Sequence, residues 1–440
     1  MKKVVIRRSD LIDGEFKVSG YKHASNVVIC AAMATAGSIQ INNIPKISDT
    51  EVLCQIIKIL GGASQFEGES LIVDCSDLDQ WEIPADLSIL SHASIYLMPV
   101  ILGKLGKVKI GKTGGCMIGD DKKNGERPVN HMLSVLSKFG ATFNESSGFI
   151  HGTSNTFTAC EIDISDYSTR QDVVTGPLIS GATKTAILAA LLTEEGVTTI
   201  KNPYQKPDVT ELLEFASNNG YDVDFTTERI KIYKNKEHVK LKTHDLLDDI
   251  STIMTYITTA LYNEISIKIR LRQPQKVQKG LKAEMEVFRK MGVKLIWNDN
   301  LLIIPKNQEI KSTNIEVTSM SIYSDHQPFF ALLLTKANDK SSITEYVWKK
   351  RFSYARELNK LSSINPFTDD GRKLEIQPAM LSNGSKILVA EDLRSAAVLL
   401  LASLGVEGST MVENIDHLAR GYENLIGDLI QLNANIKLIN

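Results

Sequence analysis

The chain has 440 residues, of which 43% are hydrophobic and 23% charged, and its formal net charge is −2. At roughly 150 residues per domain, this length predicts two or three globular domains with sizeable cores. The composition excludes a disordered, collagen-like or coiled-coil chain. The near-neutral charge argues against a nucleic-acid or anionic-membrane binder, which would carry a basic excess.

The cysteines are scattered and form no CxxC pair; they are Cys30, Cys54, Cys75, Cys116 and Cys160. This pattern predicts a reducing compartment, with neither a disulfide framework nor a zinc site. Cys30 and Cys54 lie in helical apolar periodicity and are expected to be packing residues. The histidines are dispersed, and no apolar run approaches the ~20 residues that span a bilayer. We therefore expect a cytoplasmic protein without a metal or other cofactor.

One unit recurs six times along the chain: a short strand, a turn, a helix, a Gly or Asn stop, and a second strand or hairpin. A first strand, at residues 4–8, precedes the first copy and is expected to pair within the second domain. The six strands begin near residues 38, 108, 197, 265, 342 and 409. The six helix stops are Gly61, Gly140, Gly220, Gly292, Ser362 and Asn433. Glycine or asparagine suits the left-handed residue that ends a helix.

Six βα-rich units fit two domains of three units each better than a solenoid, whose repeats are shorter. A polar, lysine-rich stretch at residues 231–243 marks the expected boundary. The predicted domains are residues 22–234, with the cysteine loop, and residues 1–21 with 235–440. A ligand is expected in a cleft between such domains.

Two motifs in the first predicted domain are candidates for function, one for anion binding and one for a reactive group. Lys22 stands just before an apolar helix, where the helix dipole and unpaired backbone N–H groups attract anions. A solvated lysine is an equally good interpretation. Cys116 follows two glycines in a charged loop at residues 112–128, and a thiol in such a loop is a candidate reactive group. An incidental surface cysteine is the alternative.

Two further motifs lie in the second predicted domain. Asp325 precedes an apolar helix, and spacing alone favours Ser324 or Asp325 as a helix cap over a general base. Arg351, Arg394 and Arg420 stand near strand-to-helix turns. Guanidinium groups at such turns can bind a carboxylate or phosphate, although each arginine alone is more often a surface residue.

Together, seven motifs resemble the UDP-N-acetylglucosamine enolpyruvyl transferase family over nearly the whole chain. They are Gly20-x-Lys22, Asn43-x-Pro45-x-x-x-Asp49, Gly114-Gly115-Cys116-x-Ile118-Gly119 with Arg127-Pro128-Val129, Ser324-Asp325-x-Gln327, Arg351-Phe352, Asp392-Leu393-Arg394-Ser395-Ala396 and Arg420-Gly421-Tyr422-Glu423. The Gly-Gly-Cys loop separates this family from the related enolpyruvylshikimate-phosphate synthases. The resemblance implies an α/β fold, a two-lobed inverted α/β barrel with three similar units per lobe.

The resemblance also implies transfer of the enolpyruvyl group of phosphoenolpyruvate to a sugar hydroxyl of a uridine nucleotide or nucleotide sugar, with release of phosphate. Three cations would match phosphate-binding positions: Lys22, Arg127 and Arg420. Arg394 would match a carboxylate-binding position, and Arg351 is also expected to bind substrate. Cys116 would act as an acid near C3, and Asp325 would accept the proton of the acceptor hydroxyl. Lobe and loop closure would exclude water.

Several positions depart from the family pattern. His23 replaces an asparagine and His92 an arginine. After Pro128, Asn130-His131 replaces Asp-Leu in the region that holds uridine. The expected substrate-binding residues thus include His23, His92, Pro128 and Asn130. These changes predict an altered acceptor. Three alternatives stay open: a cell-wall enzyme acting on UDP-N-acetylglucosamine, a specialised enzyme using another nucleotide such as UMP in nucleoside natural-product synthesis, and a non-catalytic nucleotide-binding relative.

Overall fold

The computed structural model describes residues 2–116, 118, 128–233 and 242–439, which divide into two compact units. Unit A comprises residues 20–115, 128–233 and 242–247. Unit B comprises residues 2–19, 116, 118 and 248–439. The chain therefore passes between the units at residues 19/20, 115/116 and 247/248, and once more between residues 118 and 128, so that Cys116 groups with unit B. The predicted boundary at residues 234/235 lies outside the described residues.

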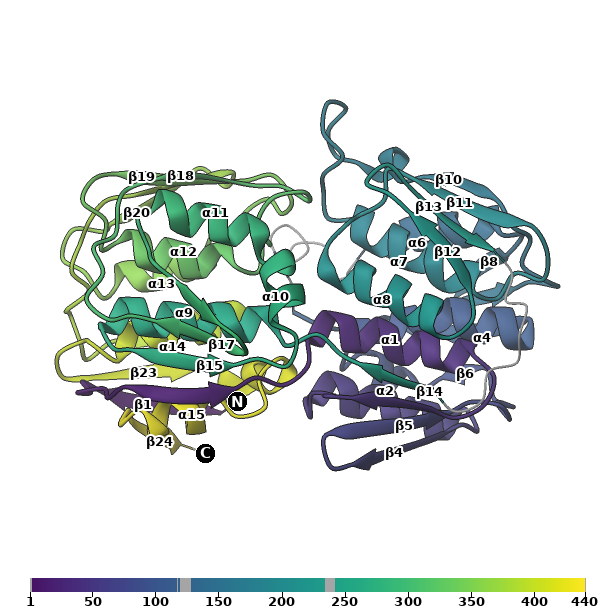
Figure 1. Cartoon of the computed structure of the whole chain (residues 1–440), viewed down its shortest axis with the longest axis horizontal. Coiled ribbons are helices and arrows are strands. Elements are labelled where there is room, and N and C mark those ends of the chain that lie inside the picture. Colours follow the sequence, from purple (N-terminus) through teal and green to yellow (C-terminus); the bar gives the residue numbers. More distant parts are fainter. Residues whose placement is uncertain (1, 117, 119–127, 234–241, 440) are drawn as a thin grey trace. The chain divides into compact units, whose positions relative to one another are not determined.

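Unit A contains three four-stranded sheets (Figure 1). The first has the order β14 (Lys242–Asp245), β3 (Ile39–Asn42), β5 (Ser70–Asp74) and β4 (Ala63–Glu67). The second has the order β6 (Glu82–Ile83), β7 (Lys107–Ile110), β9 (Phe149–Thr153) and β8 (Thr142–Ser146). The third has the order β10 (Glu161–Asp163), β11 (Val197–Lys201), β13 (Arg229–Tyr233) and β12 (Asp222–Phe225).

Unit B also contains three four-stranded sheets. The first has the order β2 (Gly14–Lys17), β15 (Ile267–Arg270), β17 (Leu301–Ile304) and β16 (Ile296–Asn298). The second has the order β18 (Asn314–Val317), β19 (Ser341–Glu345), β21 (Lys373–Ile376) and β20 (Phe367–Asp369). The third has the order β22 (Ile387–Val389), β23 (Ser409–Glu413), β1 (Lys3–Arg7) and β24 (Asn435–Ile439).

All six sheets share one pairing pattern. The first strand runs parallel to the second, the third runs antiparallel to the second, and the fourth runs antiparallel to the third. The predicted sixfold repeat, three units per domain, is therefore confirmed. The expectation for the first strand is also confirmed, because β1 pairs with both β23 and β24.

Helices connect the strands of each sheet. In unit A they are α1 (Lys22–Ala34), α2 (Ser48–Ile59), α3 (Ala85–Ser88), η1 (His92–Tyr96), α4 (Leu97–Leu105), α6 (Asn130–Lys138), η2 (Ile164–Tyr167), α7 (Ile179–Ala190) and α8 (Pro207–Asn218). In unit B they are α9 (Ile250–Asn263), α10 (Pro274–Gly280), α11 (Lys282–Lys290), α12 (Gln327–Leu334), α13 (Ser353–Asn359), α14 (Leu393–Ser403), η3 (Ile415–Arg420) and α15 (Leu425–Gln431).

Three helices form the centre of each unit, with the sheets outside them. In unit A, α1, α4 and α7 contact one another; in unit B, α9, α12 and α14 do. Every residue of α12 and α14 is buried, as are nearly all residues of α1, α7 and α9. A helix that is apolar on all sides must be enclosed by other elements. Figure 1 shows the strands of unit B around α9, α12 and α14, the inverted arrangement that the resemblance implies.

The helix stops agree with the sequence except at one position. Gly61, Gly140, Gly220, Gly292 and Asn433 have φ values of 92°, 100°, 87°, 77° and 71°. Ser362 does not adopt a positive φ, and Asn365 does so instead (φ 46°). Serine carries a Cβ that disfavours the left-handed region, whereas asparagine tolerates it. The chain therefore makes its left-handed turn three residues later in this repeat.

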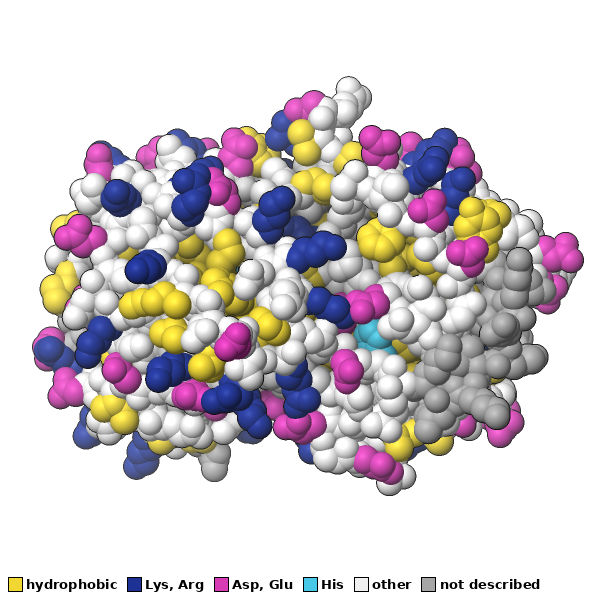
Figure 2. Space-filling model, viewed as in Figure 1, with side chains coloured by type: hydrophobic (Ala, Val, Ile, Leu, Met, Phe, Trp, Pro, Cys, Tyr) yellow, Lys and Arg dark blue, Asp and Glu magenta, His cyan; other side chains and the backbone are white. Residues whose placement is uncertain are grey.

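The surface agrees with the composition. On the face in Figure 2, basic and acidic side chains are interspersed over most of each unit. Among the described helices, none is both long and apolar enough to cross a membrane.

Candidate active site

A carboxylate between two buried arginines forms the first cluster of the candidate site, in unit B. Arg351 donates from Nη2 to Asp325 Oδ1 at 2.6 Å, and Arg394 donates from Nε to Asp325 Oδ2 at 3.2 Å. The arginine side chains are 5% and 1% exposed, whereas the Asp325 side chain is 20% exposed. Charge-assisted hydrogen bonds thus fix both carboxylate oxygens, while the group stays accessible to a ligand.

The prediction that Ser324 or Asp325 caps the following helix is wrong. The residue before α12 is His326, and no side-chain hydrogen bond caps this helix. The two arginines instead bind the Asp325 carboxylate, and Ser324 accepts a hydrogen bond from Arg351 Nη1 at 2.7 Å. Bonds to guanidinium groups are stronger than a neutral cap bond, so the side chains face the arginines.

Arg394 is oriented from both ends. Its helix, α14, begins after Asp392, whose side chain accepts from the backbone N–H groups of Arg394 and Ser395 at 2.9 and 2.8 Å, as an N-cap does. Arg394 Nη1 donates to Tyr422 Oη at 2.9 Å, and Tyr422 Oη lies 2.7 Å from Thr255 Oγ1. Arg394 Nη2 is buried and has no hydrogen-bond partner among the described residues.

Arg351 is held by a second buried network. Ser324 Oγ, which accepts from Arg351, donates to Glu345 Oε2 at 2.5 Å. The other Glu345 oxygen accepts from the backbone N–H groups of Val347 and Trp348. Burial raises the pKa of Glu345 above its ordinary value. Arg351 Nε is buried without a hydrogen-bond partner in the described part of the chain, so each arginine has one N–H that no described group accepts.

Cys116 forms the second cluster of the candidate site. Its Sγ lies 3.8 Å from His417 Nδ1 and accepts from Arg420 Nη1 at 3.4 Å. Burial acts to raise the pKa of Cys116, but the hydrogen bond with His417 and the charge of Arg420 lower it below its ordinary value. The hydrogen bond to Cys116 in turn raises the pKa of His417. The thiol is therefore a stronger acid than an ordinary cysteine.

The other four cysteines differ from Cys116. Burial raises the pKa of Cys54 and Cys160 to about 11 and that of Cys75 to about 12, and it raises the pKa of Cys30 further. Such thiols are inert packing residues. This contrast agrees with the sequence-based distinction between Cys116 and the helical Cys30 and Cys54.

Other predicted residues lie in unit A. Lys22, the first residue of α1, is buried and forms an ion pair with Asp49 at 3.0 Å. His92 begins η1, and its Nδ1 lies 3.4 Å from Thr113 Oγ1. The remaining predicted residues of this unit are His23 on α1, Pro128 just before α6, and Asn130, the first residue of α6. Arg127 lies outside the described residues.

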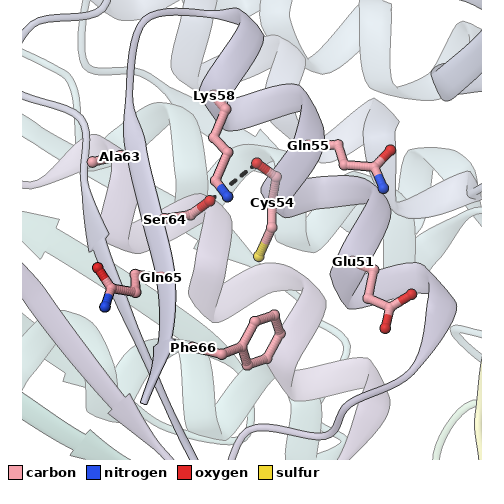
Figure 3. A pocket seen from close by; sticks show the side chains of 8 residues that line it. All are labelled: Glu51, Cys54, Gln55, Lys58, Ala63, Ser64, Gln65 and Phe66. Carbon is pink, nitrogen blue, oxygen red and sulfur yellow. Dashed lines mark hydrogen bonds between the residues drawn. The ribbon is translucent and has the colours of Figure 1, made fainter.

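A pocket on unit A contains none of the predicted site residues. It is lined by one face of α2 and by β4, including Glu51, Cys54, Lys58 and Phe66 (Figure 3). Ser64 Oγ donates to the Cys54 backbone carbonyl at 3.0 Å, and burial raises the pKa of the Cys54 thiol, which makes it a poor nucleophile. The two clusters of unit B remain the better candidates for chemistry.

The sequence patterns assigned no role to His417, Tyr422 or Glu345, although Tyr422 lies within the Arg420-Gly421-Tyr422-Glu423 motif. His417 stands three residues before Arg420 on η3, and Tyr422 follows two residues after it. The segment at residues 415–422 therefore contributes to both clusters. Its spacing around Arg420 is the signal that could have identified His417. The arrangement offers a carboxylate base, an acidic thiol and several cations, which suits addition to, and elimination from, a small dianion.

Comparison with known proteins supports this chemistry. The family model of EPSP synthase (3-phosphoshikimate 1-carboxyvinyltransferase) matches residues 6–429. A UDP-N-acetylglucosamine 1-carboxyvinyltransferase of Pelagibacter ubique is 28% identical over 442 aligned positions, covering 100% of both chains. A protein of the same name from Chlorobaculum parvum is 29% identical, covering 99% of this chain and 98% of the other.

Solved structures give the same result. The enolpyruvyl transferase NikO from Streptomyces tendae matches with a TM-score of 0.92 and 31% identity, covering 99% of each chain. EPSP synthase from Acinetobacter baumannii matches with a TM-score of 0.72 and 14% identity over 100% of each chain, a likeness of fold.

Proposed function

Because the chain belongs to the EPSP synthase (3-phosphoshikimate 1-carboxyvinyltransferase) family, whose members are enzymes, we propose that it transfers the enolpyruvyl group of phosphoenolpyruvate to a sugar hydroxyl. The acceptor is a uridine nucleotide or nucleotide sugar such as UDP-N-acetylglucosamine, and phosphate is released. The observation that carries the proposal is the Asp325 carboxylate, held between two buried arginines in the same unit as an acidified thiol.

Asp325 acts as the general base. It accepts the proton of the acceptor hydroxyl while the hydroxyl oxygen forms a bond to C2 of phosphoenolpyruvate. Arg351 and Arg394 hold its two oxygens at 2.6 and 3.2 Å. A base so fixed needs little reorganisation at the moment of transfer.

Cys116 acts as the general acid. The C2=C3 double bond of phosphoenolpyruvate takes a proton at C3 from the thiol as C2 is attacked, which gives a tetrahedral ketal. The ketal then loses a proton from C3 to the Cys116 thiolate, the C2=C3 double bond forms again, and phosphate leaves with the electron pair of its bond to C2. His417 and Arg420 stabilise the thiolate that exists between these steps. A lowered pKa favours proton donation to carbon.

The remaining cations bind the two anionic groups of phosphoenolpyruvate. Arg394 Nη2 and Arg351 Nε are buried donors without hydrogen-bond partners among the described residues, and a carboxylate could accept from them. Phosphate binding falls to three cations: Lys22, Arg127 and Arg420. Joint action of Lys22 from unit A and Arg420 from unit B on one substrate stays a prediction, as does closure of the units over it.

The identity of the acceptor is the open choice within this function. The departures at His23, His92 and Asn130, and the buried His131, favour an acceptor other than UDP-N-acetylglucosamine, such as UMP. Burial lowers the pKa of His131 to about 4, so the ring is neutral, and its Nδ1 has no hydrogen-bond partner in the described part of the chain. A neutral imidazole can read a polar acceptor group where the family has leucine.

The test is incubation with phosphoenolpyruvate and a panel of UDP-N-acetylglucosamine, UDP and UMP. Phosphate release and addition of one carboxyvinyl group to the acceptor, measured by mass spectrometry, identify the substrate. Cys116→Ser and Asp325→Ala serve as inactive controls. If none of the acceptors in the panel gives phosphate release, the proposal is refuted. Nucleotide binding without turnover would support the non-catalytic alternative.

A further inference from the structure

Three buried side chains that the proposed chemistry does not use hold the turn that carries Asp325. His326 Nδ1 lies 2.8 Å from Glu284 Oε1, and His326 Nε2 lies 2.9 Å from Ser251 Oγ. A carboxylate accepts hydrogen bonds, so the ring proton is assigned to Nδ1, and Nε2 accepts from the serine hydroxyl. Glu284 comes from α11 and Ser251 from α9, so the ring joins two helices to the turn.

The order serine, histidine, glutamate is that of a hydrolase triad, but its burial excludes this role. Ser251 and Glu284 are 1% exposed and His326 is 0% exposed. A nucleophile must meet its substrate, and no substrate reaches a serine enclosed to this degree. The three residues therefore act on the protein itself.

Their geometry fixes both ends of the turn. Glu284 Oε1 also accepts from the backbone N–H of Tyr323 at 2.9 Å, and the backbone N–H of His326 donates to the Tyr323 carbonyl at 2.9 Å. One carboxylate oxygen thus holds the first and last residues of a four-residue turn, with Asp325 between them. Buried hydrogen bonds of this kind define one backbone position because losing a partner is costly.

A second chain of hydrogen bonds links helix α9 to the Asp325 carboxylate. Thr255, one turn after Ser251, lies 2.7 Å from Tyr422 Oη, which accepts from Arg394 Nη1; Arg394 Nε in turn donates to Asp325. The first two turns of α9 therefore control the backbone of Asp325 through His326 and its carboxylate through Arg394.

We propose that Ser251, His326 and Glu284 are positioning residues, which hold the Asp325 carboxylate in reach of the acceptor hydroxyl. This inference rests on the proposed function of Asp325. A general base works only within hydrogen-bond distance of its proton, and a displacement of about 1 Å can cost on the order of 100-fold in rate. The loss falls on kcat, because these residues touch neither substrate.

The test compares Ser251→Ala with two matched variants of α9. Ser251→Ala lowers kcat by about 10- to 100-fold while KM for phosphoenolpyruvate stays within about twofold of the unchanged enzyme. Ser251→Thr retains the hydroxyl and restores kcat. Thr258→Val removes another buried hydroxyl of the same helix, whose bond goes to the Met254 carbonyl, and it leaves kcat unchanged.

A double-mutant cycle separates positioning from general destabilisation. His326→Asn keeps a donor toward Glu284 but does not reach Ser251, so it lowers kcat as Ser251→Ala does. The double variant loses no more than either single variant, because both remove the same bond. Additive losses, failure of Ser251→Thr to restore kcat, or an equal loss in Thr258→Val would overturn the inference.

Amide hydrogen exchange supplies a readout that does not depend on turnover. Ser251→Ala is expected to speed exchange in the turn of residues 323–326, whereas Thr258→Val is not. An enzyme inactive with every acceptor would refute the proposed function but leave this measurement intact. Unchanged exchange in the turn of Ser251→Ala would overturn the positioning role itself.

Discussion

Arg394→Lys tests the assignment of a carboxylate-binding arginine. Arg394 is 1% exposed and uses Nε on Asp325 and Nη1 on Tyr422, while Nη2 has no hydrogen-bond partner among the described residues. Lysine keeps the charge but cannot reproduce a planar fork with three separate directions. The substitution therefore removes at least one hydrogen bond to a charged group, which contributes about 1.5–3 kcal/mol.

Since about 1.4 kcal/mol corresponds to a tenfold change, we expect kcat/KM for phosphoenolpyruvate to fall about 10- to 150-fold. The loss falls on both constants: KM rises because the substrate carboxylate loses a donor, and kcat falls because Arg394 also holds the Asp325 carboxylate. Steady-state phosphate release at varied phosphoenolpyruvate measures both constants. Arg356→Lys, an exposed position on α13, is the control. A kcat/KM within about twofold of the unchanged enzyme, or a loss confined to kcat, would refute the reasoning.

Three further outcomes follow from the structure. His417→Asn removes a hydrogen bond that lowers the pKa of Cys116, while burial still raises this pKa. Alkylation of Cys116 by iodoacetamide should therefore slow at neutral pH, and its pH profile should move to higher pH. An unshifted profile would contradict this. Cys116→Ser and Asp325→Ala should each abolish or sharply slow phosphate release; unchanged rates in both would disprove their roles. Gly181→Ala places a Cβ 2.4 Å from His131 Nε2 and should destabilise the protein by about 1–3 kcal/mol in urea unfolding, with recovery when His131→Ala is added.

Local signals in the sequence were sufficient for the repeat. Each of the six repeats contains its own alternating strands and its own helix stop, such as Gly61 or Gly140, whose left-handed φ requires little from the rest of the chain. Pairing between distant strands has no such signal. The predicted second domain included β2 and β14, but no sequence signal indicated which sheet either strand completes, because partner choice depends on the assembled unit.

The site shows the same division between local and distant information. Spacing favoured Asp325 as a helix cap, because only its local neighbours were visible. The arginines that bind it stand 26 and 69 residues away in the chain. His417 lies 301 residues from Cys116, so no window of sequence joins them. The resemblance identified Asp325, Cys116 and Arg420, but not His417, which acts through a neighbour rather than as a motif residue.

The place of β1 affects how the protein folds during synthesis. This strand lies between β23 and β24, so it leaves the ribosome long before its partners, which begin at Ser409 and Asn435. Unit A, in contrast, draws all its strands from one continuous stretch, residues 20–247. Unit A can therefore fold while the ribosome is still translating, whereas the last sheet of unit B must wait for the end of the chain. A circular permutant that joins residue 440 to residue 1 and opens at residues 247/248 would make the strands of each unit contiguous in the chain and remove this delay.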